Sequence, residues 1–110
     1  MNYYPAFLNL KGKPCVVVGG GRVALRKIRS LLKAGAKIKV ISPEVSEEIK
    51  KLHKKGKLRL IERPFRNSDL KGAFLVIAAT SSRELHKKIQ AKHKGLLNVC
   101  LLYTSDAADE

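Results

Sequence analysis

Hydrophobic residues along this chain alternate between two spacings, one typical of strands and the other typical of helices. An apolar run at residues 15–18 predicts a buried strand that leads directly into Gly19, Gly20 and Gly21. The apolar residues that follow recur with a period of about 3.6, which predicts a helix with one buried face. They are Ala24, Ile28, Leu31 and Leu32. Gly35 is expected to end this helix.

The same pattern then repeats. Apolar and polar residues alternate over residues 36–41, which predicts a second strand. Ser42, Pro43 and Glu44 fit the N-cap, the first helical position and the acidic first turn of a second helix. That helix is expected to end at Gly56, and its apolar face is formed by Val45, Ile49 and Leu52.

Two further strands are expected before residue 80. Residues 58–61 predict the third strand, and the turn-forming residues at 64–72 predict an irregular crossover. Residues 73–79 are the most apolar segment of the chain, as expected for a strand that is covered on both faces.

The last predicted elements complete the fold class. Ser81 and Glu84 fit a capping box at the start of a third helix, and residues 96–100 predict a fifth strand. This order of elements predicts an α/β fold of the Rossmann type, with a doubly wound, mostly parallel five-stranded sheet and helices on both faces. Residues 1–100 are expected to form one dinucleotide-binding domain.

Composition is ordinary for a globular protein of 110 residues, of which 45% are hydrophobic. No apolar run approaches the roughly 20 residues of a membrane span, and the start lacks the basic region of a signal peptide. We therefore expect a cytoplasmic protein without membrane contact. Cys15 and Cys100 lie in separate apolar segments and are expected to be reduced packing residues. No metal site is expected, because His53, His86 and His93 lie in lysine-rich helical patterns.

The charge is unusual: 23 basic and 9 acidic residues give a net charge of +14. A surplus of this size attracts polyanions, so a basic nucleic-acid-binding module on a Rossmann-like scaffold is an alternative hypothesis. However, the lysines are dispersed, and the few aromatic residues do not interleave with them as a base-stacking surface requires. Nucleic acid is therefore not expected as the partner. Two explanations of the positive charge remain open. It forms either a solvated basic face or a site for an anionic ligand, which would be a polycarboxylate or a dinucleotide.

The glycine segment, residues 19–21, is the motif that predicts a ligand site. It fits the G-x-G-x-x-G/A pattern of dinucleotide-binding folds, with a strand before it, a helix after it and a second strand following. Gly19 permits the tight turn, Gly21 lacks the Cβ that would obstruct a pyrophosphate, and Ala24 lets the helix pack close to the strand. The helix N-terminus then directs its N–H groups towards the phosphates, and Arg22 can add a charge-assisted contact.

One element of that pattern is missing. The acidic residue that usually binds the ribose hydroxyls at the end of the second strand is replaced by Ile41, Ser42 and Pro43. Glu44 follows slightly late, and it is either a ribose ligand or a first-turn helix residue. The spacing alone therefore leaves NAD and NADP both open.

At the level of longer motifs, the chain resembles the N-terminal domain of siroheme synthase, the precorrin-2 dehydrogenase (sirohydrochlorin ferrochelatase) family. The resemblance runs from about residue 3 to residue 99, and it rests on residues 5–10, 16–27, 32–36, 40–43, 64–65, 73–80 and 98–99. Members of this family oxidise precorrin-2 to sirohydrochlorin with NAD, and some also insert iron to give siroheme.

The resemblance implies a cofactor site and a substrate. NAD is expected against the glycine segment and the end of the second strand, and near the end of the fourth strand. The residues implied are Gly19, Gly20, Gly21, Arg22, Val23, Ser42, Pro43, Glu44 and Thr80. Precorrin-2 is a polycarboxylate, so a basic surface would raise its encounter rate.

The chain departs from the family after Val99. Leu101 stands where the resemblance implies a catalytic aspartate, and leucine can neither accept a proton nor ligate iron. No catalytic residue is assigned, and we expect cofactor binding with little or no turnover. Residues 101–110 contain no Lys or Arg and are expected to be an atypical tail, frayed or non-native. The resemblance also implies a homodimer, and we expect this chain to lack the dimerisation region of the family. A purely regulatory dinucleotide sensor is a third hypothesis.

Overall fold

The computed structural model describes residues 9–79. Within this range the chain alternates strands with helices, as the hydrophobic pattern predicts. The elements are β1 (Pro14–Val18), α1 (Arg22–Lys33), β2 (Lys37–Ile41), α2 (Glu47–Lys54), β3 (Arg59–Ile61), the 3-10 helix η1 (Asn67–Leu70) and β4 (Leu75–Ala78). No helix among these is long and apolar enough to cross a bilayer.

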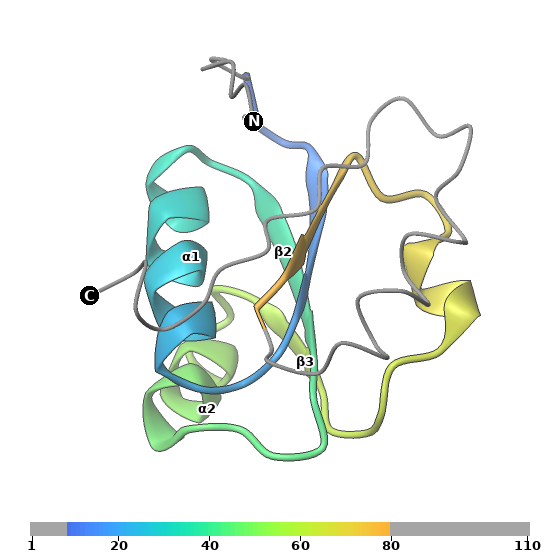
Figure 1. The fold of residues 1–110 in the computed structure, drawn as a ribbon. Coiled ribbons are helices and arrows are strands. Elements are labelled where there is room, and N and C mark those ends of the chain that lie inside the picture. The colour runs from blue at the N-terminus through green and yellow to red at the C-terminus, as the bar shows by residue number, and fades with distance from the viewer. Residues whose placement is uncertain (1–8, 80–110) are drawn as a thin grey trace, which may run out of the picture.

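The strands form a parallel sheet in the order β3-β2-β1-β4. β1 lies in the interior, where its Val17 pairs in register with Val40 of β2 and Ile77 of β4. The chain moves outward from β1 to β2 and β3, then returns across the sheet to place β4 on the other side of β1 (Figure 1). This reversal makes the carboxyl end of β1 a topological switch point, the place where open α/β sheets bind ligands.

Both α-helices pack on the same face of the sheet (Figure 1). α1 buries Ala24, Leu25, Ile28 and Leu31 against side chains of β1, β2 and β4, and Ile28 is completely shielded from solvent. Burying a side chain of this size contributes about 1.5–3 kcal/mol. Gly35 ends the helix with a φ of +79°, a conformation that disfavours a side chain, so the predicted stop is confirmed.

The opposite face is covered by the crossover from β3 to β4. Phe65 and Leu70 of this segment pack on Val18, Ile41 and Ala78, near the carboxyl ends of the strands. The described part of the chain therefore confirms a parallel Rossmann-like sheet with four strands. The predicted fifth strand and the helix that begins near Ser81 lie outside residues 9–79, so a doubly wound sheet with helices on both faces stays a prediction.

The start of the second helix was predicted wrongly. α2 begins at Glu47, and its N-cap is Ser46, whose Oγ accepts a hydrogen bond from the Ile49 N–H at 3.4 Å. Ser42 is not an N-cap, because its N–H donates to Ile61 O of β3 and its Oγ donates to Glu44 O at 2.7 Å. Residues 42–46 therefore form a connecting loop, and Val45 packs against the core from that loop.

A partly buried ion pair between Arg63 and Asp69 stabilises the crossover. Arg63 donates to both carboxylate oxygens of Asp69, at 2.7 and 2.9 Å, and the Arg66 N–H donates to Asp69 at 2.7 Å. The Asp69 side chain is only 4% exposed. The hydrogen bond from Arg63 holds the pKa of Asp69 below its ordinary value, although burial acts in the opposite direction. The pair thus ties the residues before η1 to the helix itself.

We predict that Asp69→Asn lowers the free energy of unfolding by about 2 kcal/mol at neutral pH, the scale of a hydrogen bond to a charged group. The folded-state pKa of Asp69 lies below its unfolded value of about 3.9. Its stabilising contribution is therefore complete above the unfolded pKa and is lost as pH falls through the folded one. Urea unfolding should separate wild type from variant at neutral pH, and the two should converge in acid.

Glu62→Gln is the matched control, because Glu62 is an exposed carboxylate on the same crossover. It should change stability by no more than about 0.5 kcal/mol. An equal loss in both variants, or a loss in Asp69→Asn that persists undiminished in acid, would show that the ion pair does not stabilise the crossover.

Candidate dinucleotide-binding site

The glycine loop, Gly19–Gly21, joins the carboxyl end of β1 to the start of α1. Gly19 has a φ of +134°, and its N–H donates to Ile41 O of β2 at 3.0 Å. A Cβ on Gly19 would overlap the carbonyl oxygen of Ala79, which follows β4. The predicted tight turn at this residue is therefore present, and it lies directly against the neighbouring strand end.

Gly20 is constrained from the other side. A Cβ here would overlap the Glu44 carbonyl oxygen and lie 3.0 Å from Ser42 Oγ. The Gly20 carbonyl oxygen also accepts a hydrogen bond from the Ser46 N–H at 2.9 Å. The glycine loop and the second loop, residues 42–46, are thus packed backbone to backbone.

Gly21 differs from both. It is exposed, and a Cβ built on it would meet no atom of residues 9–79 within 4 Å. Its backbone is extended, with φ −97° and ψ −157°, so any residue could adopt it. Neither packing nor conformation inside the described chain requires glycine here. In dinucleotide-binding folds, the glycine at this point of the motif leaves room for the pyrophosphate.

The first turn of α1 borders the same site as the glycine loop. Gly21 is the N-cap and has no side chain to cap the turn, which contains no acidic residue. The N-terminus of a helix presents N–H donors and a partial positive charge, both of which favour an anion. Arg22 is exposed at the first helical position, whereas Ala24 is completely buried against the sheet. This is the close helix packing that the sequence predicts for Ala24.

The second loop borders the glycine loop and presents two of the predicted residues. Pro43 and Glu44 are exposed, but Ser42 is buried and its hydroxyl donates within the loop to Glu44 O. Glu44 does not lie in the first turn of α2, which removes one of the two interpretations left open by the sequence. Gly19–Val23 and Ser42–Glu44 therefore come together at one edge of the sheet. Thr80 and Leu101 lie outside the described residues.

Three features of the described chain were not predicted from the sequence. The packing role of Gly20 is signalled only by the run of three glycines. Ser46 as N-cap could have been recognised from Glu47 and Glu48 directly after it, which suit the first turn of a helix. The pairing of Arg63 with Asp69 has no signal in the spacing. Within residues 9–79, no group of His, Cys, Asp or Glu is arranged to hold a metal ion.

Comparisons with known proteins agree with this geometry. A family model described as "Putative NAD(P)-binding" matches residues 6–107. The siroheme synthase of Nitrosococcus oceani is 43% identical over 89 residues, covering 81% of this chain and 19% of that protein. The siroheme synthase of Vesicomyosocius okutanii is 45% identical, also over 89 residues and with the same coverage. The chain thus spans only about a fifth of the length of these relatives.

Solved structures extend the likeness to three dimensions. The structure named "SirC, precorrin-2 dehydrogenase" matches with a TM-score of 0.76 and 38% identity, covering 80% of this chain and 44% of that one. The D-lactate dehydrogenase of Escherichia coli matches with a TM-score of 0.64 at 13% identity, covering 86% of this chain and 29% of that one. The second likeness concerns the fold alone. The chain thus belongs to the NAD(P)-binding family described by this model, and it is homologous to the N-terminal region of siroheme synthases and to the precorrin-2 dehydrogenase SirC.

Proposed function

We propose that this chain is the NAD-binding part of a precorrin-2 dehydrogenase, which oxidises precorrin-2 to sirohydrochlorin in siroheme biosynthesis. The proposal rests on the open space above Gly21. Packing within the chain explains why positions 19 and 20 are glycine, but it does not explain the glycine at position 21. The homology to siroheme synthases and to SirC supports the reaction and the substrate.

Four residues of the site and the first turn of α1 are proposed to hold the cofactor. Gly21 leaves room for the pyrophosphate, and the first-turn N–H groups of α1 donate to it. Arg22 adds positive charge beside the phosphates, and Pro43 and Glu44 border the adenosine ribose. The bound dinucleotide supplies a hydride acceptor, and this chain contributes its binding and orientation.

The substrate is proposed to be drawn to the site by charge. Precorrin-2 carries several carboxylates, and a chain with a net charge of +14 would raise its encounter rate. Because such attraction is screened by ions, substrate binding should weaken as salt increases. Substrate affinity that is independent of salt would contradict this part of the proposal.

The cofactor proposal predicts saturable binding of NAD. Calorimetric titration with NAD, NADP and a short DNA duplex, each at low and moderate salt, provides the measurement. NAD binding should survive the increase in salt, NADP should bind more weakly, and DNA binding should be weak throughout. Steeply salt-dependent DNA binding without dinucleotide affinity would instead support the nucleic-acid-binding alternative.

Substitutions in the glycine loop separate ligand binding from folding. Gly21→Ser should maintain stability or raise it by a few tenths of a kcal/mol, because serine is a slightly better N-cap than glycine. The same side chain would fill the pyrophosphate position and accept a first-turn N–H, so NAD affinity should fall at least about tenfold, or 1.4 kcal/mol.

Gly20→Ala is the comparison variant for this experiment. Its Cβ would overlap the Glu44 carbonyl oxygen, so the variant should lose stability even without ligand. Thermal unfolding with and without NAD distinguishes the two effects. Unchanged NAD affinity in Gly21→Ser would place the cofactor elsewhere.

Turnover is proposed to be low. Leu101 stands where the resemblance places a catalytic aspartate, and a leucine side chain cannot take part in proton transfer. We therefore expect this chain to bind NAD but to produce little or no NADH when precorrin-2 is added. NADH absorbance, compared with that from an intact siroheme synthase under the same conditions, tests this expectation. A comparable rate would overturn it.

A further inference from the structure

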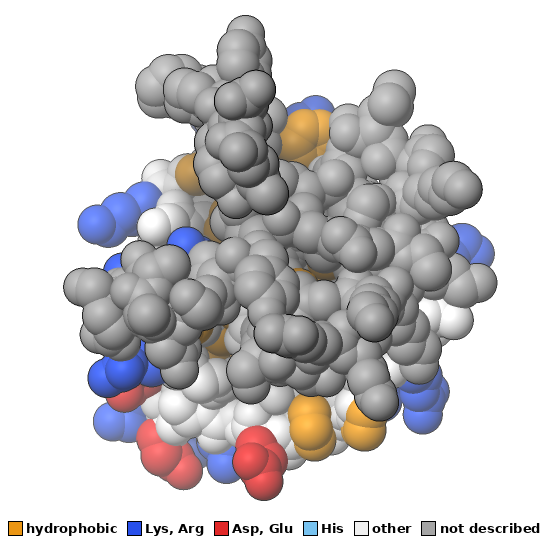
Figure 2. Space-filling view, viewed as in Figure 1, with side chains coloured by type: hydrophobic (Ala, Val, Ile, Leu, Met, Phe, Trp, Pro, Cys, Tyr) orange, Lys and Arg blue, Asp and Glu red, His pale blue; other side chains and the backbone are white. Residues whose placement is uncertain are grey.

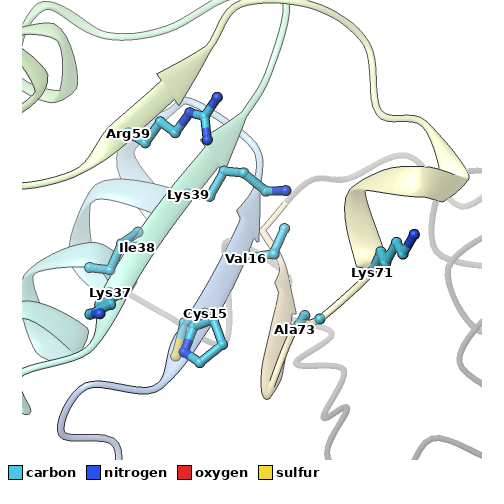
Figure 3. Close-up of a pocket in the computed structure, with 10 residues that line it drawn as sticks. Cys15, Val16, Lys37, Ile38, Lys39, Arg59, Lys71 and Ala73 are labelled. Carbon is cyan, nitrogen blue, oxygen red and sulfur yellow. The ribbon is translucent and has the colours of Figure 1, made fainter.

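A cationic groove lies on the sheet face opposite α1 and α2, away from the glycine loop. It is a hollow of about 280 Å³ at the amino-terminal half of the strands, and Val16 and Ala73 form part of its lining (Figure 3). The basic side chains that line it are Lys37, Lys39, Arg59 and Lys71. No acidic residue is among the lining residues.

Strand geometry explains why these charges gather. Ile38 and Val40 of β2 point into the core beneath the helices, so the alternating residues Lys37 and Lys39 point to the opposite face. Lys39 is in register with Arg59 of β3 on one side and with Val16 of β1 on the other. Lys71, from the segment after η1, lies across Val16 from Lys39 (Figure 3).

This arrangement works against folding of the chain by itself. Like charges directly opposite each other on neighbouring strands are destabilising, and Lys39 is half-buried rather than free in solvent. Asp69 is the carboxylate whose pKa Lys39 influences. However, both oxygens of Asp69 are held by Arg63, and one also accepts from the Arg66 N–H. The positive charge of the groove is therefore not neutralised by an ion pair within residues 9–79.

We propose that this groove binds a compact polyanion, a small molecule with several phosphate or carboxylate groups close together. Lysine and arginine are the side chains that recognise these groups, and four of them line one hollow. A nucleic-acid strand fits less well, because the lining contains no aromatic residue on which a base could stack. The site is independent of the proposed dinucleotide site, since the two lie at opposite ends of the strands.

The test is calorimetric titration of the whole chain with inorganic tripolyphosphate and, separately, with citrate. Both probes should bind with one-site stoichiometry, and their relative affinity distinguishes a phosphate ligand from a carboxylate one. The double variant Lys39→Gln with Arg59→Gln should weaken binding at least about tenfold, the effect of losing one strong charge-assisted contact. In the absence of ligand, the variant should unfold at a higher temperature, because the repulsion is relieved.

Two controls make the result specific. Lys57→Gln removes a positive charge from an exposed position outside the groove, and it should change tripolyphosphate affinity less than twofold. Gly21→Ser should leave tripolyphosphate binding intact, which excludes binding at the helix N-terminus. The groove double variant should keep the NAD affinity of the wild type, so this proposal and the cofactor proposal can fail separately.

Three outcomes would overturn the inference. The first is unchanged tripolyphosphate and citrate affinity in the double variant. The second is an equal loss in Lys57→Gln, which would mean that the anions respond only to net charge. The third is binding of a short DNA duplex that is tighter than that of either small anion and is lost in the double variant, which would make the occupant a nucleic acid.

Discussion

The arrangement of this domain depends on direct backbone contact at the carboxyl end of β1. Gly19 lies against the Ala79 carbonyl and Gly20 against the Glu44 carbonyl, so a side chain at either position would overlap a neighbouring strand end or loop. Because β1 lies between β2 and β4, the segments that leave these parallel strands converge there. Gly21 and Arg22, which follow these two glycines, are exposed. The packing of the fold thereby creates the space proposed for a pyrophosphate.

The two faces of the sheet present different kinds of side chain. Helices α1 and α2 cover one face with apolar side chains, and the crossover covers the carboxyl-terminal half of the other face with Phe65 and Leu70. The amino-terminal half of that second face instead presents lysines from β2 and an arginine from β3. Lys and Arg side chains are spread over several parts of the surface (Figure 2). Part of the positive charge is nevertheless collected in this concave site. The Arg63–Asp69 ion pair lies in this crossover and joins the residues before η1 to η1 itself.

Much of the fold and of the candidate site could be predicted from local pattern. The strands and helices up to residue 79 follow from the change between strand and helix spacing, and most of their limits differ from expectation by a residue or two. Gly19 and Ala24 act as the motif predicts. The predicted start of α2 was wrong because Ser42, Pro43 and Glu44 together match the local pattern of a helix start. The hydrogen bond from Ser42 N–H to β3 and the packing of Gly20 on this loop override that signal.

Within residues 9–79, the sequence by itself determined the order of strands and helices and the place of the glycine loop, and it showed which family the chain resembles. These are local properties, set by the spacing of apolar residues and by the conformational freedom of glycine. Only the tertiary structure decided that Gly20 serves packing while Gly21 stays exposed, that Asp69 pairs with Arg63, and that four dispersed cations line one groove. Each of these depends on which strands are neighbours and in what register, and contacts between residues distant in the chain leave no periodic signal in it.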